Sequence, residues 1–137
     1  MKTCLLVPVI LALAAALLAG GCDGFERDAY RTLKVAKVEY ELLQEHAARA
    51  YLSGRLSEEQ WNRFAIAGHR FIAAHTLAAD LLKTYQEARR AGDAAEGQSR
   101  AEAIHQQALA ALAELPRLLA DLRVLLESFN AAAPAES

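Results

Sequence analysis

The chain has 137 residues, of which 54% are hydrophobic, and its 15 basic and 17 acidic side chains give a formal net charge of −2. This length suits one domain, which is large enough to bury a core of its own. Charges of both signs are mixed along the chain and no basic block occurs, which argues against nucleic acid as a partner.

Residues 1–22 have the pattern of an export signal. A lysine next to Met1 is followed by an apolar run from Cys4 to Leu18, and small residues then lead to Cys22. A charged start, a short apolar core and a small-residue end are typical of a secretory signal peptide. The run is shorter than the roughly 20 apolar residues that a membrane-spanning helix needs.

The end of this segment, Leu18-Ala19-Gly20-Gly21-Cys22, resembles the lipobox of bacterial lipoproteins, although its leucine lies four rather than three places before the cysteine. The resemblance implies cleavage before Cys22, acylation of its thiol and new amino group, and anchoring in a membrane of the bacterial cell envelope. The domain would then face the periplasm or the exterior. Asp23 resembles a signal of enterobacterial lipoproteins for retention in the inner membrane. An ordinary cleaved signal and an uncleaved anchor are the alternatives for residues 1–21.

Removal of residues 1–21 would leave 116 residues with 14 basic and 17 acidic side chains, a net charge of −3. Cys4 would leave with the signal and Cys22 would carry lipid, so the exported domain would hold no disulfide and depend on packing alone. Ala and Leu dominate the rest, while Gly and Pro are few. This composition favours helix throughout.

Apolar residues recur in steps of three and four over three segments, which predicts helices at about 25–52, 58–91 and 99–129. Residues 22–24 are expected to form the lipidated cysteine and a spacer, and 130–137 a disordered tail. The short connections between the segments predict an all-α fold, a three-helix up-down-up antiparallel bundle behind the N-terminal signal or anchor segment.

The connection near residues 53–57 carries the clearest local signals. Gly54 can adopt the left-handed conformation that ends a helix. Ser57 and Gln60 have the spacing of a capping box, and Leu56 and Trp61 have that of a hydrophobic staple. We therefore expect a tight turn between antiparallel helices here.

Each predicted helix has an apolar face that should point inward. On the first helix it comprises Ala29, Leu33, Ala36, Tyr40, Leu43, Ala47 and Ala50, widened by Val35, Val38 and Leu42. On the second it comprises Trp61, Phe64, Gly68, Phe71, His75, Ala78, Leu82 and Tyr85. A glycine within a helix costs about 1 kcal/mol relative to alanine, so Gly68 predicts the close approach of a neighbouring helix or a bulky ring.

The third predicted helix has two apolar lines. The main line runs from Ala101 to Phe129, and a second line consists of Leu112, Leu119 and Leu126. The surplus of leucines predicts a face for a partner protein or a second copy of the chain. Alternatively, Pro116 bends the helix, and the two other helices then cover both lines.

Of the four histidines, only His75 lies on an inward face. It is a candidate ligand for a metal or haem, or a pH sensor; the alternative is a half-buried histidine without such a role. No histidine pair has the spacing of a zinc helix, and no phosphate loop, nucleophile elbow or Cys-His pair occurs. We therefore expect no enzyme, no catalytic residue, no metal site and no cofactor.

These features predict a lipid-anchored envelope bundle that acts as a structural or adaptor module. Its partners would be the membrane, through lipid on Cys22, and an envelope protein or a second copy. One alternative is a periplasmic module that binds a small apolar ligand, a metal or haem beside His75. Another alternative is an immunity or exclusion-type lipoprotein, which would have the same architecture.

Overall fold

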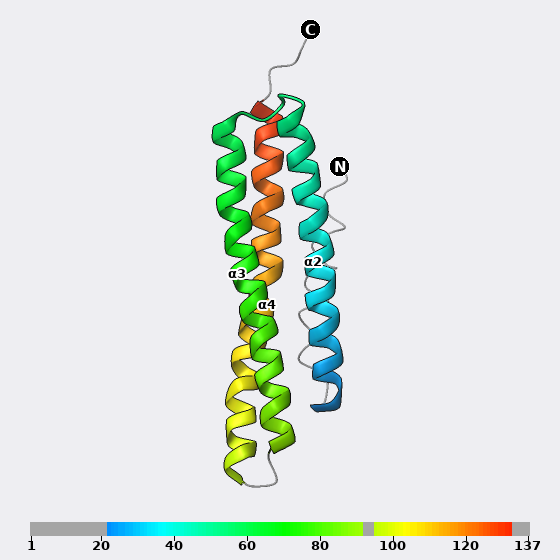
Figure 1. Ribbon diagram of the computed structural model, residues 1–137, viewed down its shortest axis with the longest axis vertical. Helices are drawn as coiled ribbons and strands as arrows, with labels where there is room; N and C mark the ends of the chain where they lie inside the picture. Colours follow the sequence, from blue (N-terminus) through cyan, green and yellow to red (C-terminus); the bar gives the residue numbers. More distant parts are fainter. Residues whose placement is uncertain (1–21, 92–94, 133–137) are drawn as a thin grey trace.

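The computed structural model describes residues 22–91 and 95–132. They form three helices, α2 (Cys22–Leu52), α3 (Glu58–Ala91) and α4 (Ala95–Ala132), and no strand occurs among them. The helices pack as an up-down-up bundle, which confirms the predicted fold class (Figure 1). The predicted signal peptide and the last five residues of the predicted tail lie outside the described residues.

Two helices begin earlier than the periodicity predicted. The expected spacer, residues 22–24, belongs to the first turn of α2, and α4 starts at Ala95 rather than near residue 99. The third helix also continues to Ala132, into the expected tail. Alanine and glutamate favour helix, and Glu96 lies in the first turn of α4, where the helix dipole favours an acid.

The turn between α2 and α3 has the predicted geometry. Gly54 has a φ of 74°, and the amides of Gly54 and Arg55 donate to the carbonyls of Tyr51 and Ala50 at 3.0 and 2.8 Å. This is the pattern of a Schellman motif. The capping box is closed in both directions, by Ser57 N–H to Gln60 Oε1 at 2.8 Å and by Gln60 N–H to Ser57 Oγ at 3.2 Å. These bonds fix two long helices in antiparallel orientation.

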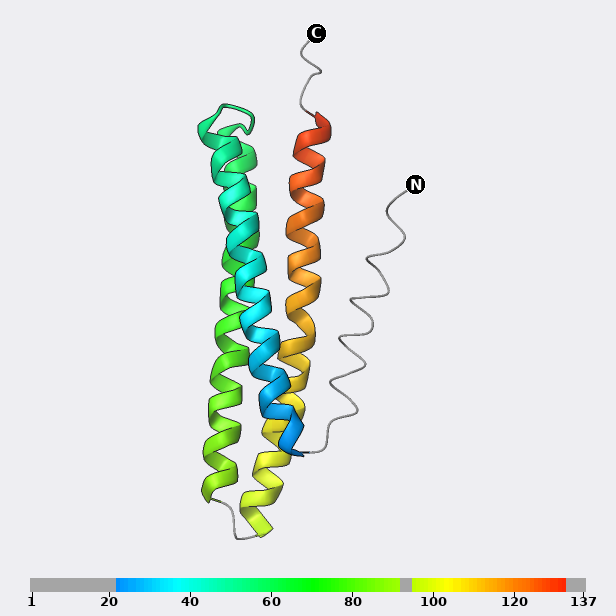
Figure 2. The same ribbon diagram turned by 90° about the vertical axis from the view of Figure 1, so that its right-hand side faces the viewer.

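The three helices do not contribute equally to the bundle. α3 and α4 run side by side and share by far the most extensive interface. α2 is shorter and begins some way in from the ends of α3 and α4 that the 92–94 connection joins (Figure 2). Phe25, in the first turn of α2, packs its ring edge-on against Tyr85 of α3 and His105 of α4. The distances between ring centres are 5.1 and 4.3 Å.

The close approach predicted at Gly68 is confirmed. A methyl group added there would lie 2.8 Å from the phenol oxygen of Tyr40. The Tyr40 ring stacks on Phe71 with 4.7 Å between ring centres, and both residues are buried. Burial also raises the pKa of Tyr40 above its ordinary value of 10.0. Glycine at this position therefore makes room for the largest side chain that α2 places in the middle of the core.

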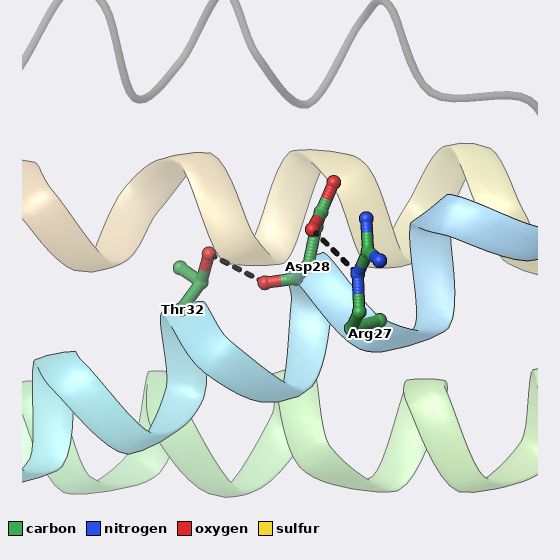
Figure 3. Close-up of polar contacts among 3 residues, drawn as sticks. All are labelled: Arg27, Asp28 and Thr32. Atoms are coloured by element: carbon green, nitrogen blue, oxygen red, sulfur yellow. Dashed lines mark hydrogen bonds and ion pairs between the residues drawn. The ribbon is translucent and has the colours of Figure 1, made fainter.

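One buried polar side chain interrupts the apolar face of α2. Thr32 donates a hydrogen bond from Oγ1 to the carbonyl oxygen of Asp28 at 2.9 Å, one turn earlier (Figure 3). The Asp28 carboxylate itself lies 3.6 Å from Nε of the exposed Arg27. Because the hydroxyl finds its partner within α2, Thr32 can be buried without a bond to another helix.

Candidate functional site

Cys22, the predicted lipid site, is the first residue of α2. The start of α2 lies toward the end of the bundle at which residues 92–94 connect α3 and α4 (Figures 1 and 2). Its acylation stays a prediction, since the preceding residues are outside the described part of the chain. None of the three described helices combines the length and the hydropathy that a membrane span requires.

The partner face predicted on the third helix is wrong in its location. Leu112, Leu119 and Leu126 are only 0, 4 and 6% exposed, so they belong to the core and cannot contact a partner from the surface. The physical reason is that α4 packs along α3 and also contacts α2. The alternative, that the other two helices cover both apolar lines, therefore agrees with the observed burial. Within these two lines, only Leu118 and Leu125 stay half-buried.

An exposed apolar face lies instead on α2. Val35, Val38 and Leu42 were expected to widen the inward face, but they are 51, 49 and 62% exposed. Both neighbours of α2 cover its other side, where the alanines are, so these three residues face away from the bundle. They follow one another in steps of three and four, and we call them the α2 stripe.

His75 lies where α3 meets α2 and is half-buried. Its Nε2 is 3.0 Å from the carbonyl oxygen of Leu33. A carbonyl oxygen only accepts hydrogen bonds, so Nε2 carries the hydrogen and the bond ties α3 to α2. Among the described residues, no three His, Cys, Asp or Glu side chains converge in a way that could hold a metal ion.

A groove of about 600 Å³ runs between α2 and α3 and is open to solvent. Tyr30, Leu33, Lys34 and Lys37 line it from α2 at helical spacing, and α3 contributes His75, Ala79, Leu82, Lys83 and Gln86. From the first to the last of these α3 residues there are eleven steps, which correspond to about 16 Å along the helix. The floor includes the buried Leu33 and Leu82, and the exposed Lys34, Lys37 and Lys83 line the groove around it.

Lysines line this groove and arginines do not. Lysine occurs at four positions, 2, 34, 37 and 83, and the last three all line the groove. None of the eleven arginines does. Lys37 lies 3.8 Å from Glu41 on the exposed surface of α2, whereas Lys34 and Lys83 form no ion pair with any residue in the described ranges. No carboxylate is among the residues that line the groove.

The groove is closed at one end by a polar contact between the helices. Gln86 donates from Nε2 to Oε2 of Glu26 at 3.1 Å, and the other carboxylate oxygen of Glu26 lies 3.7 Å from Arg89. Both carboxylate oxygens of Glu26 are thus engaged by α3. The open part of the groove combines an apolar floor with three ammonium groups, and it can attract an anion that has an apolar body.

His75 was predicted from the sequence as a candidate site residue, but the groove was not. The sequence feature that could have indicated the groove is that lysine occurs at only three positions after residue 22. Lys34 and Lys37 fall beside Leu33, which was expected to face inward, and this places them at the edge of the helix interface. The pairing of α2 with α3 then brings Lys83 to the same groove.

Comparisons of the chain with protein-family models, with curated proteins and with solved structures gave no match.

Proposed function

We propose that this protein is a lipid-anchored interaction module of the bacterial cell envelope, in which lipid on Cys22 holds the bundle at a membrane and the α2 stripe contacts a partner. The observation that carries the proposal is the α2 stripe: Val35, Val38 and Leu42 are 51, 49 and 62% exposed and follow one another in steps of three and four on one face of α2. Exposed apolar residues gathered on one face indicate an interaction surface.

The position of Cys22 supports the same function. Because α2 begins at the predicted lipid site without an intervening spacer, an anchored bundle would rise from the membrane directly. The α2 stripe starts 13 residues after Cys22, or about 20 Å farther along the helix. It would be held at a fixed height, where it can meet other molecules anchored in the same membrane.

The partner that this surface fits best is a second copy of the chain. The spacing of the α2 stripe is that of a and d positions in a coiled coil. Two copies anchored in one membrane through residue 22 of each chain would have parallel α2 helices, so the α2 stripe of one copy would face the same residues of the other.

The small size of the α2 stripe also explains why an anchor would be needed. Three side chains bury far less than the roughly 1,200 Å² of a stable interface. Confinement to one membrane raises the effective concentration of the partner without any new contact. We therefore expect the pairing to depend on the lipid.

The lipid is tested first by the intact mass of the protein extracted from membranes. The proposal requires an N-terminus at an acylated Cys22, and an unmodified cysteine or a different N-terminus would exclude the anchor. The pairing is then tested with Val38→Cys, because the introduced cysteine would be the only free thiol in an acylated mature chain. Oxidation in vesicles should give a disulfide-linked dimer.

A cysteine in place of Ile66, an exposed residue of α3, is the matched control and should stay monomeric. The Val38→Cys dimer should also be lost when Cys22→Ser removes the lipid. Equal dimer yields from both cysteines would show random collision and contradict the pairing. If a photoreactive residue at position 38 captures another envelope protein in cells and no second copy, that protein replaces the second copy as the partner.

A further inference from the structure

We propose that the groove between α2 and α3 binds a small anionic amphiphile, a molecule with one acidic head and one unbranched apolar body. The acidic head would lie among Lys34, Lys37 and Lys83, and the apolar body would lie on Leu33, Ala79 and Leu82. This site is separate from the α2 stripe and does not depend on the pairing of two copies.

The groove is lined by three lysines and by no arginine, although arginine outnumbers lysine in this chain. An ammonium group is a compact, mobile point charge on a flexible apolar stem, whereas a guanidinium is a planar fork suited to fixed bidentate contacts. Three lysine stems can extend the apolar floor while their charged ends gather around one acidic group.

The positive charge in the groove is largely unpaired. Lys34 and Lys83 come from different helices and have no ion-pair partner within the described ranges, and no carboxylate lines the groove between them. Lys37 has only an exposed neighbour, Glu41, at 3.8 Å. Three like charges that line one groove repel one another. An anion placed among them would remove this repulsion, which makes the site complementary to a negative head.

The size and shape of the groove suit a small molecule. The volume of about 600 Å³ lies within the range of small-molecule sites, about 300–1,000 Å³. The groove is long and open, and the contact between Gln86 and Glu26 limits it at one end. A neutral apolar molecule would leave the ammonium groups without partners, and a small inorganic anion would leave the floor uncovered. An amphiphile uses both features.

The test follows the reactivity of the lysines, because each is a reporter at the site. The protein, with the N-terminus that the cell gives it, is placed in neutral phosphatidylcholine vesicles. An amine-reactive reagent is added, and modification of Lys34, Lys37 and Lys83 is followed by mass spectrometry. Three probes are compared: decanoate, decanol with the same apolar body but no charge, and acetate with the same head but no apolar body.

The expected result is that decanoate slows modification of Lys34, Lys37 and Lys83 to a plateau, while decanol and acetate do not. In the variant Lys34→Gln/Lys83→Gln, protection of Lys37 should need about tenfold more decanoate, as two exposed ion pairs are lost. The variant Arg70→Gln/Arg117→Gln removes the same charge elsewhere on the exposed surface and should behave like the wild type.

Several results would overturn the proposal. Equal protection by decanol would mean simple apolar adsorption, and equal protection by acetate would mean a site for any anion. Equal weakening in the arginine variant would mean a response to net charge. Absence of protection by decanoate would show that an amphiphile is not the ligand. Circular dichroism of both variants establishes that the helices are intact.

Discussion

At position 68 two opposing effects meet, and their balance can be measured. Alanine in place of Gly68 would gain up to about 1 kcal/mol of helix propensity. The new methyl group would lie 2.8 Å from the phenol oxygen of Tyr40, which is held in place by stacking on Phe71. Overpacking of this kind costs about 1–3 kcal/mol. We expect Gly68→Ala to lower the free energy of unfolding by about 1 kcal/mol in urea denaturation.

The cause can be isolated with Tyr40→Phe, which removes only the oxygen in close contact. In that background the next nearest atoms of the ring would lie at 3.4 and 3.5 Å, which is ordinary contact. Gly68→Ala should therefore change sign and stabilise by up to about 1 kcal/mol. Gly24→Ala, where a methyl group meets nothing within 4 Å, is the control. Destabilisation by Gly68→Ala in both backgrounds would show that the phenol oxygen is not responsible.

At the scale of the element, two leucines with equal helical propensity report on which faces are covered. Leu119 of α4 is 4% exposed and Leu42 of α2 is 62% exposed. Truncation of a buried leucine costs about 2–5 kcal/mol, whereas an exposed site away from special features changes stability by at most about 0.5 kcal/mol. We expect Leu119→Ala to fall in the first range and Leu42→Ala in the second, as measured by urea denaturation of each variant.

The same substitution at both sites makes the comparison direct, because the change in helix propensity is shared. A cost above 2 kcal/mol for Leu42→Ala would mean that the α2 stripe is buried in the protein in solution. That outcome would contradict the surface on which the proposed pairing rests. If the protein is paired in vesicles, Leu42→Ala should weaken the Val38→Cys crosslink while leaving the stability of the bundle unchanged.

Sequence periodicity predicted the helices and most of the core but not which apolar residues stay exposed. Steps of three and four define a face, and Ala29, Phe64 and Leu115 lie inward as expected. Periodicity does not tell how wide an arc the neighbouring helices cover. α4 is covered over a broad arc, which buries Leu119, whereas the covered arc of α2 is narrow enough to leave Val38 in solvent. That difference follows from the arrangement of three helices in space.

The same limit applies to the groove. Each lysine alone is an ordinary surface residue of one helix. Their meeting depends on the register between α2 and α3, which is fixed by the turn at Gly54 and Ser57 and by the bond from His75 to the Leu33 carbonyl. The turn was predictable from local sequence. The register that brings Lys83 beside Lys34 was not, since it results from packing over several turns.

At the scale of the whole molecule, the bundle consists of a strong α3–α4 pair and a more weakly held α2. Four of the seven buried apolar residues of α2 are alanines, at positions 29, 36, 47 and 50, whereas seven of the ten that α4 buries are leucine, isoleucine or phenylalanine. Burial of apolar area stabilises by about 25 cal/mol per Å², so the small side chains of α2 hold it less firmly. The interface between α3 and α4 is also the most extensive.

This asymmetry predicts the order in which the helices open. Local unfolding requires less free energy where fewer apolar contacts must be broken. We expect native-state hydrogen exchange to show that amides of α2 are less protected than those in the middle of α3 and α4. Uniform protection at the global free energy of unfolding would instead mean that the three helices open only together.

Removal of one ion pair between α2 and α4 should weaken the packing of α2 without affecting the α3–α4 interface. Arg123 of α4 pairs with Glu39 of α2, and both side chains are partly buried. Such a pair contributes up to about 1 kcal/mol after solvent screening, so Arg123→Gln should speed exchange in α2 by up to about fivefold. Exchange in the middle of α3 should not follow. Arg117→Gln, an exposed change on the same helix, serves as the control. Since the α2 stripe and half of the groove belong to α2, any loosening of this helix would affect both proposed sites while the α3–α4 pair stays folded.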